Sequence, residues 1–316
     1  MLEDRLVLCT GGSGYVGSVL VPLLVERGYR VRTYDNQMFG NPNAGLTGVE
    51  CQSGDIRDRD GVAWALEGVT DVIALAGIVT DELVDQNPRK AREINLNALR
   101  QLCELSSAAR VSRLIYASSS SVYGHRASSA TERDEPRPMT EYARTKRDGE
   151  CIVHEFKDLM TVVAVRSATC CGPSPRMRLD TIVNAFSAGA YFNNIIEVHG
   201  GDQWRTNIHV RDAAEFYLCC LEAPILLLKD GEAFNVTASN DTALDLARMV
   251  AALIPAKVHI DETKRDSRHY MMDGAKAQRV LGWSPKRALY EAVLDNLAWF
   301  KAGGIKDHKD DLYYNT

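Results

Sequence analysis

The first half of the chain alternates short apolar runs with longer segments in which apolar residues recur at helical spacing. The apolar runs predict strands, at Arg5–Cys9, Arg30–Tyr34, Val49–Gln52, Asp71–Leu75, Arg113–Ala117 and Thr161–Arg166. The helical patterns lie between them, at Tyr15–Arg27, Arg59–Leu66, Lys90–Ala109 and Glu141–Phe156. This alternation predicts an α/β fold, a doubly wound parallel sheet with helices on both faces. Strands covered on both faces should be almost wholly apolar, and LVLC, VIALA and TVVAV have that composition.

A glycine-rich turn, TGGSGYVG from Thr10 to Gly17, joins the first predicted strand to the first predicted helix. Gly12, Gly14 and Gly17 have the G-x-G-x-x-G spacing, which allows a tight turn, close approach of a pyrophosphate, and close packing of helix on strand. The helix N-terminus offers N–H groups and the positive end of its dipole to the anion. The motif predicts a Rossmann-type dinucleotide site with contacts from Gly11, Gly14, Tyr15, Val16 and Gly17.

An acidic residue indicates which dinucleotide is bound. Asp35 ends the second apolar run, near the ~20-residue offset at which a carboxylate meets a ribose 2′-hydroxyl. A carboxylate there disfavours a 2′-phosphate, and no basic residue follows in Asn36-Gln37-Met38. We therefore expect NAD rather than NADP as the cofactor, with contacts from Asp35 and Asn36.

Composition and charge narrow the classes of function. The chain has 316 residues, of which 45% are hydrophobic and 25% charged, as in ordinary globular proteins. Its net charge of -5 argues against a nucleic-acid partner. No signal-peptide pattern precedes the first strand, and apolar runs such as Ile225–Leu228 are too short to span a membrane. The eight cysteines lack C-x-x-C spacing and the histidines lack H-E-x-x-H, so we expect a reduced cytoplasmic protein without a metal.

The stretch GDIRD follows the third predicted strand and has two interpretations. Asp55 could hydrogen-bond the amino group of an adenine while Ile56 covers the ring. Alternatively, Asp55 or Asp58 is simply the N-cap of the helix that follows. The residues by themselves favour neither interpretation.

The fourth predicted strand ends in small residues. Leu75, Ala76 and Gly77 would let a dinucleotide pass along the carboxyl edge of the sheet, where ligands of open α/β sheets bind. Tight packing of strand on helix would select the same residues. In the helix that follows, Asn95 is a polar residue in a core-like pattern. It either holds a water or a backbone carbonyl behind the site, or it is exposed.

A serine cluster and a Tyr-x-x-x-Lys pair supply candidate chemistry. Ser118 to Ser121 follow the fifth predicted strand, at the edge that faces the ligand crevice. Tyr142 and Lys146 lie four residues apart, on one face of a predicted helix. A tyrosine is a poor base at neutral pH, but a nearby ammonium and a positive nicotinamide ring would favour the phenolate and lower the pKa of Tyr142. Ser119 would then orient the same substrate hydroxyl.

The combination TGGSGYVG, Asp35, GDIRD, SSSSVYG and YARTK resembles the extended short-chain dehydrogenase/reductase family, the NAD-dependent nucleotide-sugar epimerases and dehydratases. The resemblance covers almost the whole chain. It implies that Tyr142 is the general acid/base, that Lys146 holds the nicotinamide ribose, and that Ser119 touches the sugar hydroxyl. It also favours a structural role for Asn95 and the adenine contact of the GDIRD stretch.

The second half of the chain carries candidate substrate contacts. Its RSATCCGP stretch resembles the family's RxxNVYGP segment but has Thr169 in place of the asparagine that meets the nucleotide sugar. Guanidinium groups suit a diphosphate because they bind it in bidentate fashion, and a surface salt bridge is the alternative role for each. By resemblance, Arg205 and Arg268 match the family's diphosphate arginines. The candidates are Ser118 toward the cofactor and Ser119, Ser120, Thr169, Arg176, Arg178, Asn184, Arg205 and Arg268 toward the substrate.

The resemblance implies an oxidoreductase with tightly held NAD that acts on a nucleotide-diphosphate sugar. Tyr142 would remove the proton of the C4 hydroxyl, and re-reduction of the 4-keto sugar on its other face would give the C4 epimer. The family's 4,6-dehydratases carry an Asp-Glu pair where this chain has Ser120 and Ser121, which disfavours dehydration. The alternatives are a net 4-dehydrogenase or 4-reductase and, in another class, a non-catalytic NAD-binding regulator. The stretches SPRMRLD and HVRD most resemble a bacterial branch of the family that includes GDP-heptose dehydrogenases.

The same resemblance implies how the chain divides into domains and that it forms a dimer. We expect residues 1–174 to form the NAD-binding domain, with segments near 203–237 returning to it, and residues 175–316 to form mainly a smaller substrate-binding domain. The helices Lys90–Ala109 and Glu141–Phe156 would pair across a two-fold axis into a four-helix homodimer contact.

Two local predictions complete the sequence-based description. Asp212 follows the predicted strand Thr206–Val210 and is the expected N-cap of the helix Ala213–Leu221. The tail from Gly303 has mixed charges and no apolar period, so we expect it to be frayed.

Overall fold

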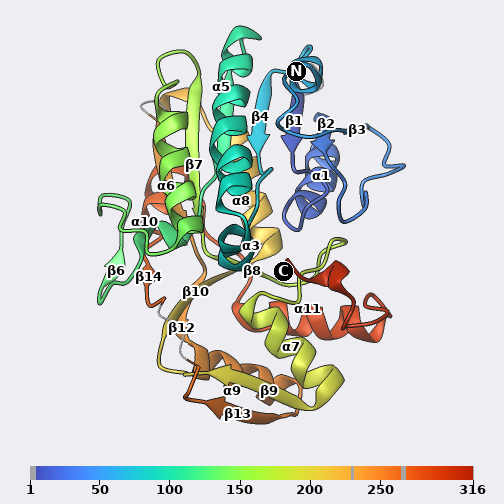
Figure 1. Ribbon diagram of the computed structural model, residues 1–316, viewed down its shortest axis with the longest axis vertical. Coiled ribbons are helices and arrows are strands. Elements are labelled where there is room, and N and C mark those ends of the chain that lie inside the picture. Colours follow the sequence, from blue (N-terminus) through green and yellow to red (C-terminus); the bar gives the residue numbers. More distant parts are fainter. Residues whose placement is uncertain (1–4, 229–230, 265–267, 316) are drawn as a thin grey trace.

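The computed structural model describes residues 5–228, 231–264 and 268–315. At its centre is a seven-stranded parallel sheet with the strand order β11-β7-β5-β4-β1-β2-β3 (Figure 1). The strands are β1 Leu6–Thr10, β2 Arg30–Asp35, β3 Val49–Ser53, β4 Asp71–Ala74, β5 Arg113–Ala117, β7 Thr161–Ser167 and β11 Glu232–Val236. The strand order reverses beside β1, so the predicted doubly wound sheet of the Rossmann type is confirmed.

Alternate residues of these strands enter two separate apolar layers, because successive side chains of a strand point to opposite faces. On β1, Val7 and Cys9 enter one layer, and Leu6 and Leu8 enter the other. The helices over the first layer are α1 Gly17–Glu26 and α8 Val210–Glu222, and those over the second are α2 Arg59–Ala65, α5 Ala98–Ala108 and α6 Glu141–His154. Covering on both faces explains why the strands are almost wholly apolar.

The predicted helix Lys90–Ala109 is three helical segments rather than one. α4 covers Pro88–Arg92, a π-helical turn covers Glu93–Asn97, and α5 follows. The wide turn places Asn95 inward, where its side chain hydrogen-bonds the backbone of Ile78. A π turn closes its hydrogen bonds over one more residue than an α-helix, and apolar spacing alone does not reveal that insertion.

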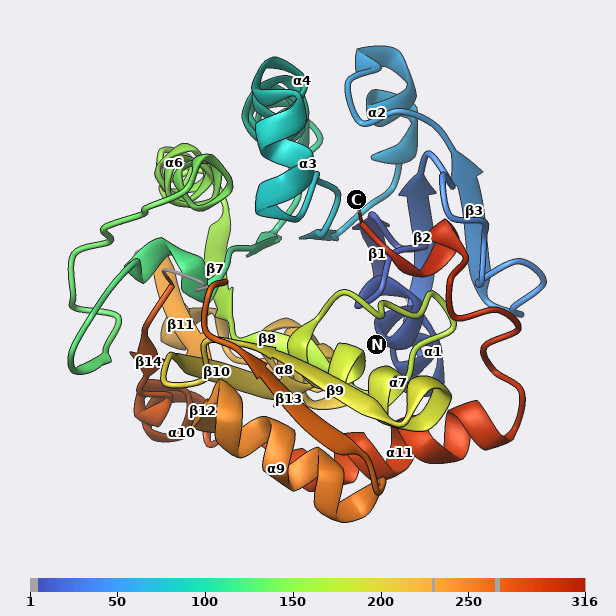
Figure 2. The same cartoon turned by 60° about the horizontal axis from the view of Figure 1, so that its bottom comes forward.

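A second body of smaller sheets lies beyond the carboxyl ends of the large sheet's strands, at the bottom of Figure 1 and in front in Figure 2. Its sheets pair β8 Thr169–Cys171, β10 Trp204–His209 and β12 Ser239–Thr242; β9 Ile195–His199 and β13 Lys257–Asp261; and β6 Ser129–Ala130 and β14 Met271–Met272. Its helices are α7 Ile182–Asn193, α9 Ala243–Leu253 and α11 Leu289–Lys301, whereas α10 Ala275–Leu281 packs on the large sheet beside β11. A separate apolar core forms where α7, α9 and α11 pack on β9.

Asp212 is not the N-cap of its helix. α8 begins at Val210, and His209 caps it by accepting a hydrogen bond from the Arg211 amide at 3.0 Å. The Asp212 carboxylate instead accepts hydrogen bonds from the backbone amides of Lys286 and Arg287, at 3.0 and 2.8 Å, and from the Arg287 guanidinium. Asp212 therefore ties α8 to the turn before α11, a contact over more than seventy residues that local capping rules cannot foresee.

Replacing Asp212 by Ala should lower the free energy of unfolding by about 2 kcal/mol, because two backbone amides lose their buried acceptor. Asp212 is 1% exposed, so water cannot replace it readily. Urea unfolding followed by circular dichroism measures the change. Glu104→Gln, which breaks the exposed pair with Arg59, is the matched control and should change stability by less than about 0.5 kcal/mol. Equal effects of the two substitutions would refute this account of Asp212.

The C-terminal tail from Gly303 is packed against the protein, so the expected fraying is wrong. Ile305 is buried in an apolar cluster, and the ring of His308 stacks on Phe192 with centroids 4.6 Å apart. The carbonyl oxygen of Tyr313 accepts a hydrogen bond from a backbone amide before α7 at 2.8 Å. The tail lacks an apolar period because a few separate contacts hold it, and none of them repeats at helical or strand spacing.

Candidate active site

The glycine turn between β1 and α1 is shaped by two very close backbone approaches. A Cβ on Gly11, whose φ is +72°, would lie 2.6 Å from the backbone nitrogen of Ala76. A Cβ on Gly17 would lie 2.5 Å from the carbonyl oxygen of Gly11. Side chains at these positions would push the turn away from β4 or from α1. The turn therefore presents bare backbone at the edge of the sheet, which is what a closely bound diphosphate requires.

The start of α1 is free of side-chain caps within the described residues. Val16 occupies the N-cap position and makes no side-chain hydrogen bond to the first turn. Tyr15 is buried, and its hydroxyl donates a hydrogen bond to the carbonyl oxygen of Gly172 at 2.6 Å. An uncapped helix start beside a glycine turn has the donors and the dipole for a dinucleotide diphosphate, so the residues present fit NAD.

Asp35 holds the glycine turn from the end of β2. One carboxylate oxygen accepts a hydrogen bond from the Ser13 amide at 3.0 Å, and the other accepts one from the Gln37 amide at 2.7 Å. Burial raises the pKa of Asp35, and these two hydrogen bonds oppose that shift. The carboxylate lies directly beside the turn, where the sequence predicts a ribose contact. The neighbouring Asn36 accepts a hydrogen bond from the Met38 amide at 3.1 Å.

Of the two aspartates in the GDIRD stretch, Asp58 and not Asp55 caps the following helix. Asp58 is the N-cap of α2 and accepts a hydrogen bond from the Asp60 amide. The Asp55 carboxylate is bound by the guanidinium of Arg57 at 2.9 and 2.6 Å, and this partner lowers the pKa of Asp55. Ile56 is partly buried against the apolar layer under α2. The adenine contact of Asp55 and Ile56 stays a prediction.

Asn95 lies behind the carboxyl end of β4 and is only 4% exposed, so the exposed alternative is wrong. Its amide accepts from the Ile78 backbone N–H at 2.8 Å and donates to the Ile78 carbonyl at 2.9 Å. It also donates to the hydroxyl of Thr145 on α6 at 3.2 Å. Asn95 thereby fixes the loop that contains Leu75, Ala76 and Gly77, and joins it to the helix with the Tyr-x-x-x-Lys pair.

Tyr142 and Lys146 lie on one face of α6, next to the serine cluster that follows β5. The Lys146 ammonium is 5.9 Å from the centroid of the Tyr142 ring and donates a hydrogen bond to the carbonyl oxygen of Ala117 at 2.8 Å. The Ser119 side chain hydrogen-bonds Tyr142 and also accepts from the Ser121 hydroxyl at 2.9 Å. A phenol, an ammonium and a hydroxyl therefore converge at the carboxyl end of β5.

Burial dominates the electrostatics of this pair. It raises the pKa of Tyr142 to about 12, against the opposing effects of the Ser119 hydrogen bond and the positive charge of Arg178. It lowers the pKa of Lys146 to about 8, against the opposing charge of Glu150. The expected lowering of the Tyr142 pKa is therefore not found in the protein without ligand. Further positive charge beside the phenol is needed to make it a base near neutral pH.

The candidate substrate arginines approach this cluster from the second body. Arg178 forms a bidentate pair with Asp180 at 2.9 and 2.5 Å. Arg205 is buried and donates to the backbone carbonyl of Arg268, and Arg268 in turn pairs with Asp81 at 3.0 Å, at the start of α3 Asp81–Gln86. The structure thus brings Arg205 and Arg268 together from segments sixty-three positions apart.

The model of the NAD dependent epimerase/dehydratase family matches residues 7–237, well over half of the chain. The chain belongs to this family. The match confirms the resemblance to extended short-chain dehydrogenases/reductases, a family of nucleotide-sugar enzymes with NAD as cofactor.

Relatives and solved structures of this family cover nearly the whole chain. UDP-glucose 4-epimerase from Halalkalibacterium halodurans is 27% identical over 322 residues, 93% of this chain and 94% of that protein. dTDP-D-glucose 4,6-dehydratase from Bos taurus is 26% identical over 326 residues, 93% of this chain and 88% of that protein. The structure of MoeE5 in complex with UDP-glucuronic acid and NAD has a TM-score of 0.84 at 26% identity, over 94% of this chain and 99% of that chain.

Two family positions on the substrate side are more buried than the sequence suggests. Asn184 is 0% exposed and has four protein partners: the Gly172 amide at 2.8 Å, the Tyr15 hydroxyl at 2.9 Å, the Arg178 carbonyl at 2.8 Å and the Asn296 side-chain amide at 2.9 Å. It braces the segment that precedes α7 and leaves no surface for a ligand in this structure. Thr169 lies on β8 and is partly buried.

Glu150 is a site residue that the sequence analysis missed. It lies one turn after Lys146 on α6, and it pairs with the buried Arg166 at 2.9 and 2.7 Å. The Ser118 hydroxyl also donates to Glu150, so in this structure Ser118 faces that carboxylate. Arg166 continues the chain of contacts by donating to the Tyr123 hydroxyl at 2.8 Å. The detectable signal is the i, i+4, i+8 stripe of Tyr142, Lys146 and Glu150.

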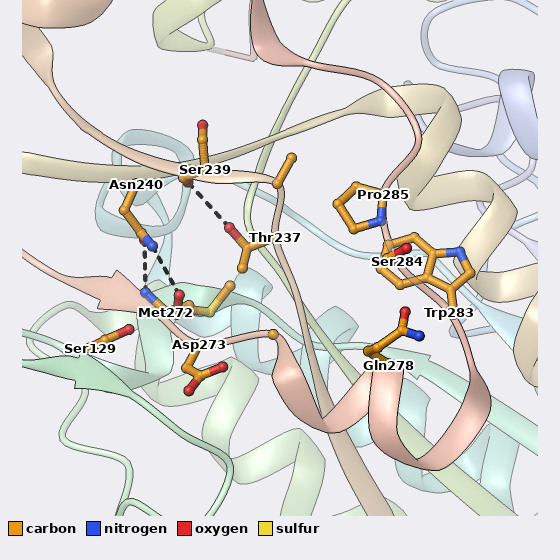
Figure 3. A pocket seen from close by; sticks show the side chains of 12 residues that line it. Ser129, Thr237, Ser239, Asn240, Met272, Asp273, Gln278, Trp283, Ser284 and Pro285 are labelled. Atoms are coloured by element: carbon orange, nitrogen blue, oxygen red, sulfur yellow. Dashed lines mark hydrogen bonds between the residues drawn. The ribbon is translucent and has the colours of Figure 1, made fainter.

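A surface hollow of about 460 Å³ lies away from this cluster, between β12, β14 and the turn after α10 (Figure 3). Its wall is polar, and Asn240 accepts a hydrogen bond from the Met272 amide at 2.9 Å and donates one to the Met272 carbonyl at 3.0 Å. None of the residues predicted for the cofactor or the substrate lines it.

Neither a membrane span nor a metal cluster is found within residues 5–228, 231–264 and 268–315. No helix there is long and apolar enough to cross a bilayer. No three or more His, Cys, Asp or Glu side chains of those residues gather in a way that could hold a metal ion.

Replacing Lys146 by Met should change how stability depends on pH. Between pH 8 and 10.5 the unfolded chain keeps a proton that the buried Lys146 has lost, so the stability of the wild type should rise with pH in this window. Met at this position removes that contribution. From about pH 7 to about pH 10.5, the free energy of unfolding of the wild type should therefore increase by about 3 kcal/mol relative to that of Lys146→Met.

Urea unfolding of both proteins across this window measures the shift. Lys301→Met, at an exposed position of α11, is the matched control and should follow the wild type at all pH values. Parallel curves for the wild type and Lys146→Met would show that the ammonium is not buried as described.

Proposed function

We propose that this protein is a nucleotide-sugar epimerase that acts by transient oxidation at C4 of the sugar, with NAD as its cofactor. The convergence of Ser119, Tyr142 and Lys146 at the carboxyl end of β5, two strands from the glycine turn that follows β1, carries the proposal. The named activity of the curated relatives, UDP-glucose 4-epimerase, supports it. A diphosphate sugar would lie across the crevice between the serine cluster and the pair Arg205 and Arg268.

The residues present account for the proton transfers of such a reaction. Tyr142 takes the proton of the C4 hydroxyl and returns it to C4 oxygen in the second half of the cycle. Ser119 hydrogen-bonds the same hydroxyl and fixes its direction. The ammonium of Lys146 stabilises the phenolate through charge at short range. NAD supplies the hydride acceptor and, once reduced, the hydride donor.

The serine cluster argues against the 4,6-dehydratase reaction, although dehydratases are among the relatives. Elimination of water from C5 and C6 needs a second acid/base pair close to the serine at position 119. This chain has Ser120 and Ser121 there. The Ser120 side chain is buried and 3.4 Å from the Tyr270 hydroxyl, and the Ser121 hydroxyl donates to Ser119. Neither serine hydroxyl can replace a carboxyl group as a general acid or base, because an alcohol does not ionise near neutral pH.

One experiment separates the candidate functions. The purified protein is denatured, the released nucleotide is identified, and the native protein is offered UDP-, GDP-, CDP- and dTDP-sugars while absorbance at NADH wavelengths and product stereochemistry are followed. Turnover without added NAD supports the epimerase. NADH that accumulates in proportion to substrate would instead make the protein a net 4-dehydrogenase. A protein that binds NAD but turns over no sugar would be the non-catalytic regulator.

Tyr142→Phe should reduce kcat on the accepted sugar by a factor on the order of 1,000, because the general acid/base is lost while the packing of the ring remains. NAD retention after gel filtration should be unchanged, since the phenol does not hold the dinucleotide in place. Tyr290→Phe, at an exposed position of α11, is the matched control and should keep full activity. Activity of Tyr142→Phe within a factor of about three of the wild type would reject the proposed mechanism.

We also propose a homodimer through α5 and α6. α6 packs beside α5 and α4: the pair Arg100–Glu155, at 2.6 Å, joins the end of α6 to α5, and the pair Arg92–Glu141, at 2.5 Å, joins α6 to α4. Light scattering coupled to gel filtration should give twice the chain mass of 35.0 kDa at micromolar concentration. A mass of one chain would contradict the dimer without affecting the catalytic proposal.

We also propose a cytoplasmic location, which the chemistry of the thiols supports. All eight cysteines are free, and burial raises the pKa of Cys9, Cys103 and Cys171, which keeps these thiols protonated and unreactive. A reducing compartment suits such a set.

A further inference from the structure

Arg176 is a buried guanidinium without a carboxylate partner among the described residues. Its side chain is 5% exposed, and it contacts the Met177 carbonyl at 3.0 Å, the ring of Phe39 at 3.8 Å from the centroid, and the side-chain oxygen of Asn315. The nearest acid, Asp180, is engaged by Arg178. All contacts of Arg176 are therefore to neutral groups, although buried charges are normally paired.

The position of Arg176 points to an anion as its missing partner. Its backbone amide donates to the Ser18 hydroxyl in the first turn of α1, at 3.4 Å. The preceding Ser174 donates to the Tyr15 carbonyl in the glycine turn, at 2.8 Å. Phe39 belongs to the loop after β2, four residues beyond Asp35. Arg176 thus lies beside the turn and the helix start, whose donors suit a diphosphate.

The end of the C-terminal tail occupies this guanidinium. The Asn315 side-chain oxygen accepts from Arg176, and its backbone carbonyl accepts from the Thr80 hydroxyl at 3.0 Å. Thr80 is the N-cap of α3, on the loop that follows β4. Figure 2 shows the C-terminus beside β1 and α3, between the large sheet and the second body. The tail therefore crosses the crevice in which the ligands of this fold bind.

We propose that Arg176 binds a diphosphate and that Asn315 is a placeholder which the diphosphate displaces, so that the C-terminal tail is a lid on the crevice. The neutral amide oxygen of Asn315 satisfies the geometry of the guanidinium but cannot balance its charge, whereas a diphosphate does both. His308, stacked on Phe192, anchors the base of the lid. This inference rests on the proposed function, and the diphosphate belongs either to NAD or to the nucleotide sugar.

Two substitutions of opposite sign test the lid. Asn315→Ala removes the group that competes for Arg176, so UDP or NAD should bind roughly three- to tenfold more tightly. Asn315→Asp places a carboxylate on Arg176, so the same ligand should bind more weakly by a similar factor. Both variants keep the backbone contact with Thr80. Calorimetric titration with UDP and, separately, with NAD shows which diphosphate competes with the tail. Lys309→Ala, at an exposed position of the tail, is the matched control and should bind as the wild type does.

Limited trypsin digestion gives a second readout that needs no turnover. Cleavage after the exposed Lys309 should be faster in Asn315→Ala than in the wild type and slowest in Asn315→Asp, with no ligand present. UDP or NAD should accelerate the cleavage in the wild type, and Arg176→Gln should abolish that acceleration. The lid proposal would be overturned if Asn315→Ala bound UDP and NAD more weakly than the wild type, or if UDP or NAD slowed cleavage of the tail by trypsin.

The two readouts also separate the lid from the proposed function. If the wild type bound neither UDP nor NAD, the proposed function would fail, and the order of cleavage among the ligand-free variants would still report whether Asn315 holds the tail closed. Equal cleavage of the ligand-free variants, together with normal binding of UDP and NAD, would overturn the lid alone.

Discussion

An ammonium buried beside a phenol is the constraint around which the site is built. Water does not reach Lys146, so the cost of its charge must be offset by fixed partners, which are the carbonyl of Ala117 and the carboxylate of Glu150. The same burial opposes ionisation of Tyr142. Burial thus disfavours the charged form of both groups, and a bound NAD would supply the further positive charge that favours the phenolate.

The partners of Lys146 extend this constraint through the fold. Glu150 is held by Arg166 on β7, and Arg166 contacts Tyr123, whose hydroxyl donates to Asn235 on β11 at 2.6 Å. Each member satisfies a polar group of the next, so the network rigidifies the carboxyl ends of β5, β7 and β11 together. The position of Lys146 thus depends on strands that are distant in sequence and adjacent in the sheet.

The crevice itself is assembled from contacts between the two bodies. Tyr15 in the glycine turn donates to Gly172 after β8, and Asp81 at the start of α3 pairs with Arg268. The C-terminal tail closes the gap between them through Asn315. These contacts join segments that are 139 to 235 residues apart, so packing over long separations holds this region together.

Repeating patterns of the sequence determined the large sheet and the place of the chemistry. Short, almost wholly apolar runs located six of its seven strands, and the glycine spacing, Asp35 and the Tyr-x-x-x-Lys pair located the candidate site. These signals are local: each depends on residues within one turn, one strand or one helix face. The π turn around Asn95 escaped because a single inserted residue leaves the apolar pattern almost unchanged.

Only the tertiary structure decided which polar side chains serve the site and which brace the fold. The sequence predicts a ligand contact at Asn184 and a helix cap at Asp212. Asn184 instead hydrogen-bonds the distant Tyr15 side chain, and Asp212 hydrogen-bonds the distant Lys286 amide. Glu150 had only its place in the stripe with Tyr142 and Lys146 as a signal, and the tail residue Asn315 had no local signal at all. The physical reason is that a polar side chain is satisfied by whatever lies opposite it in the folded chain, and that partner is set by packing over long separations rather than by neighbouring residues.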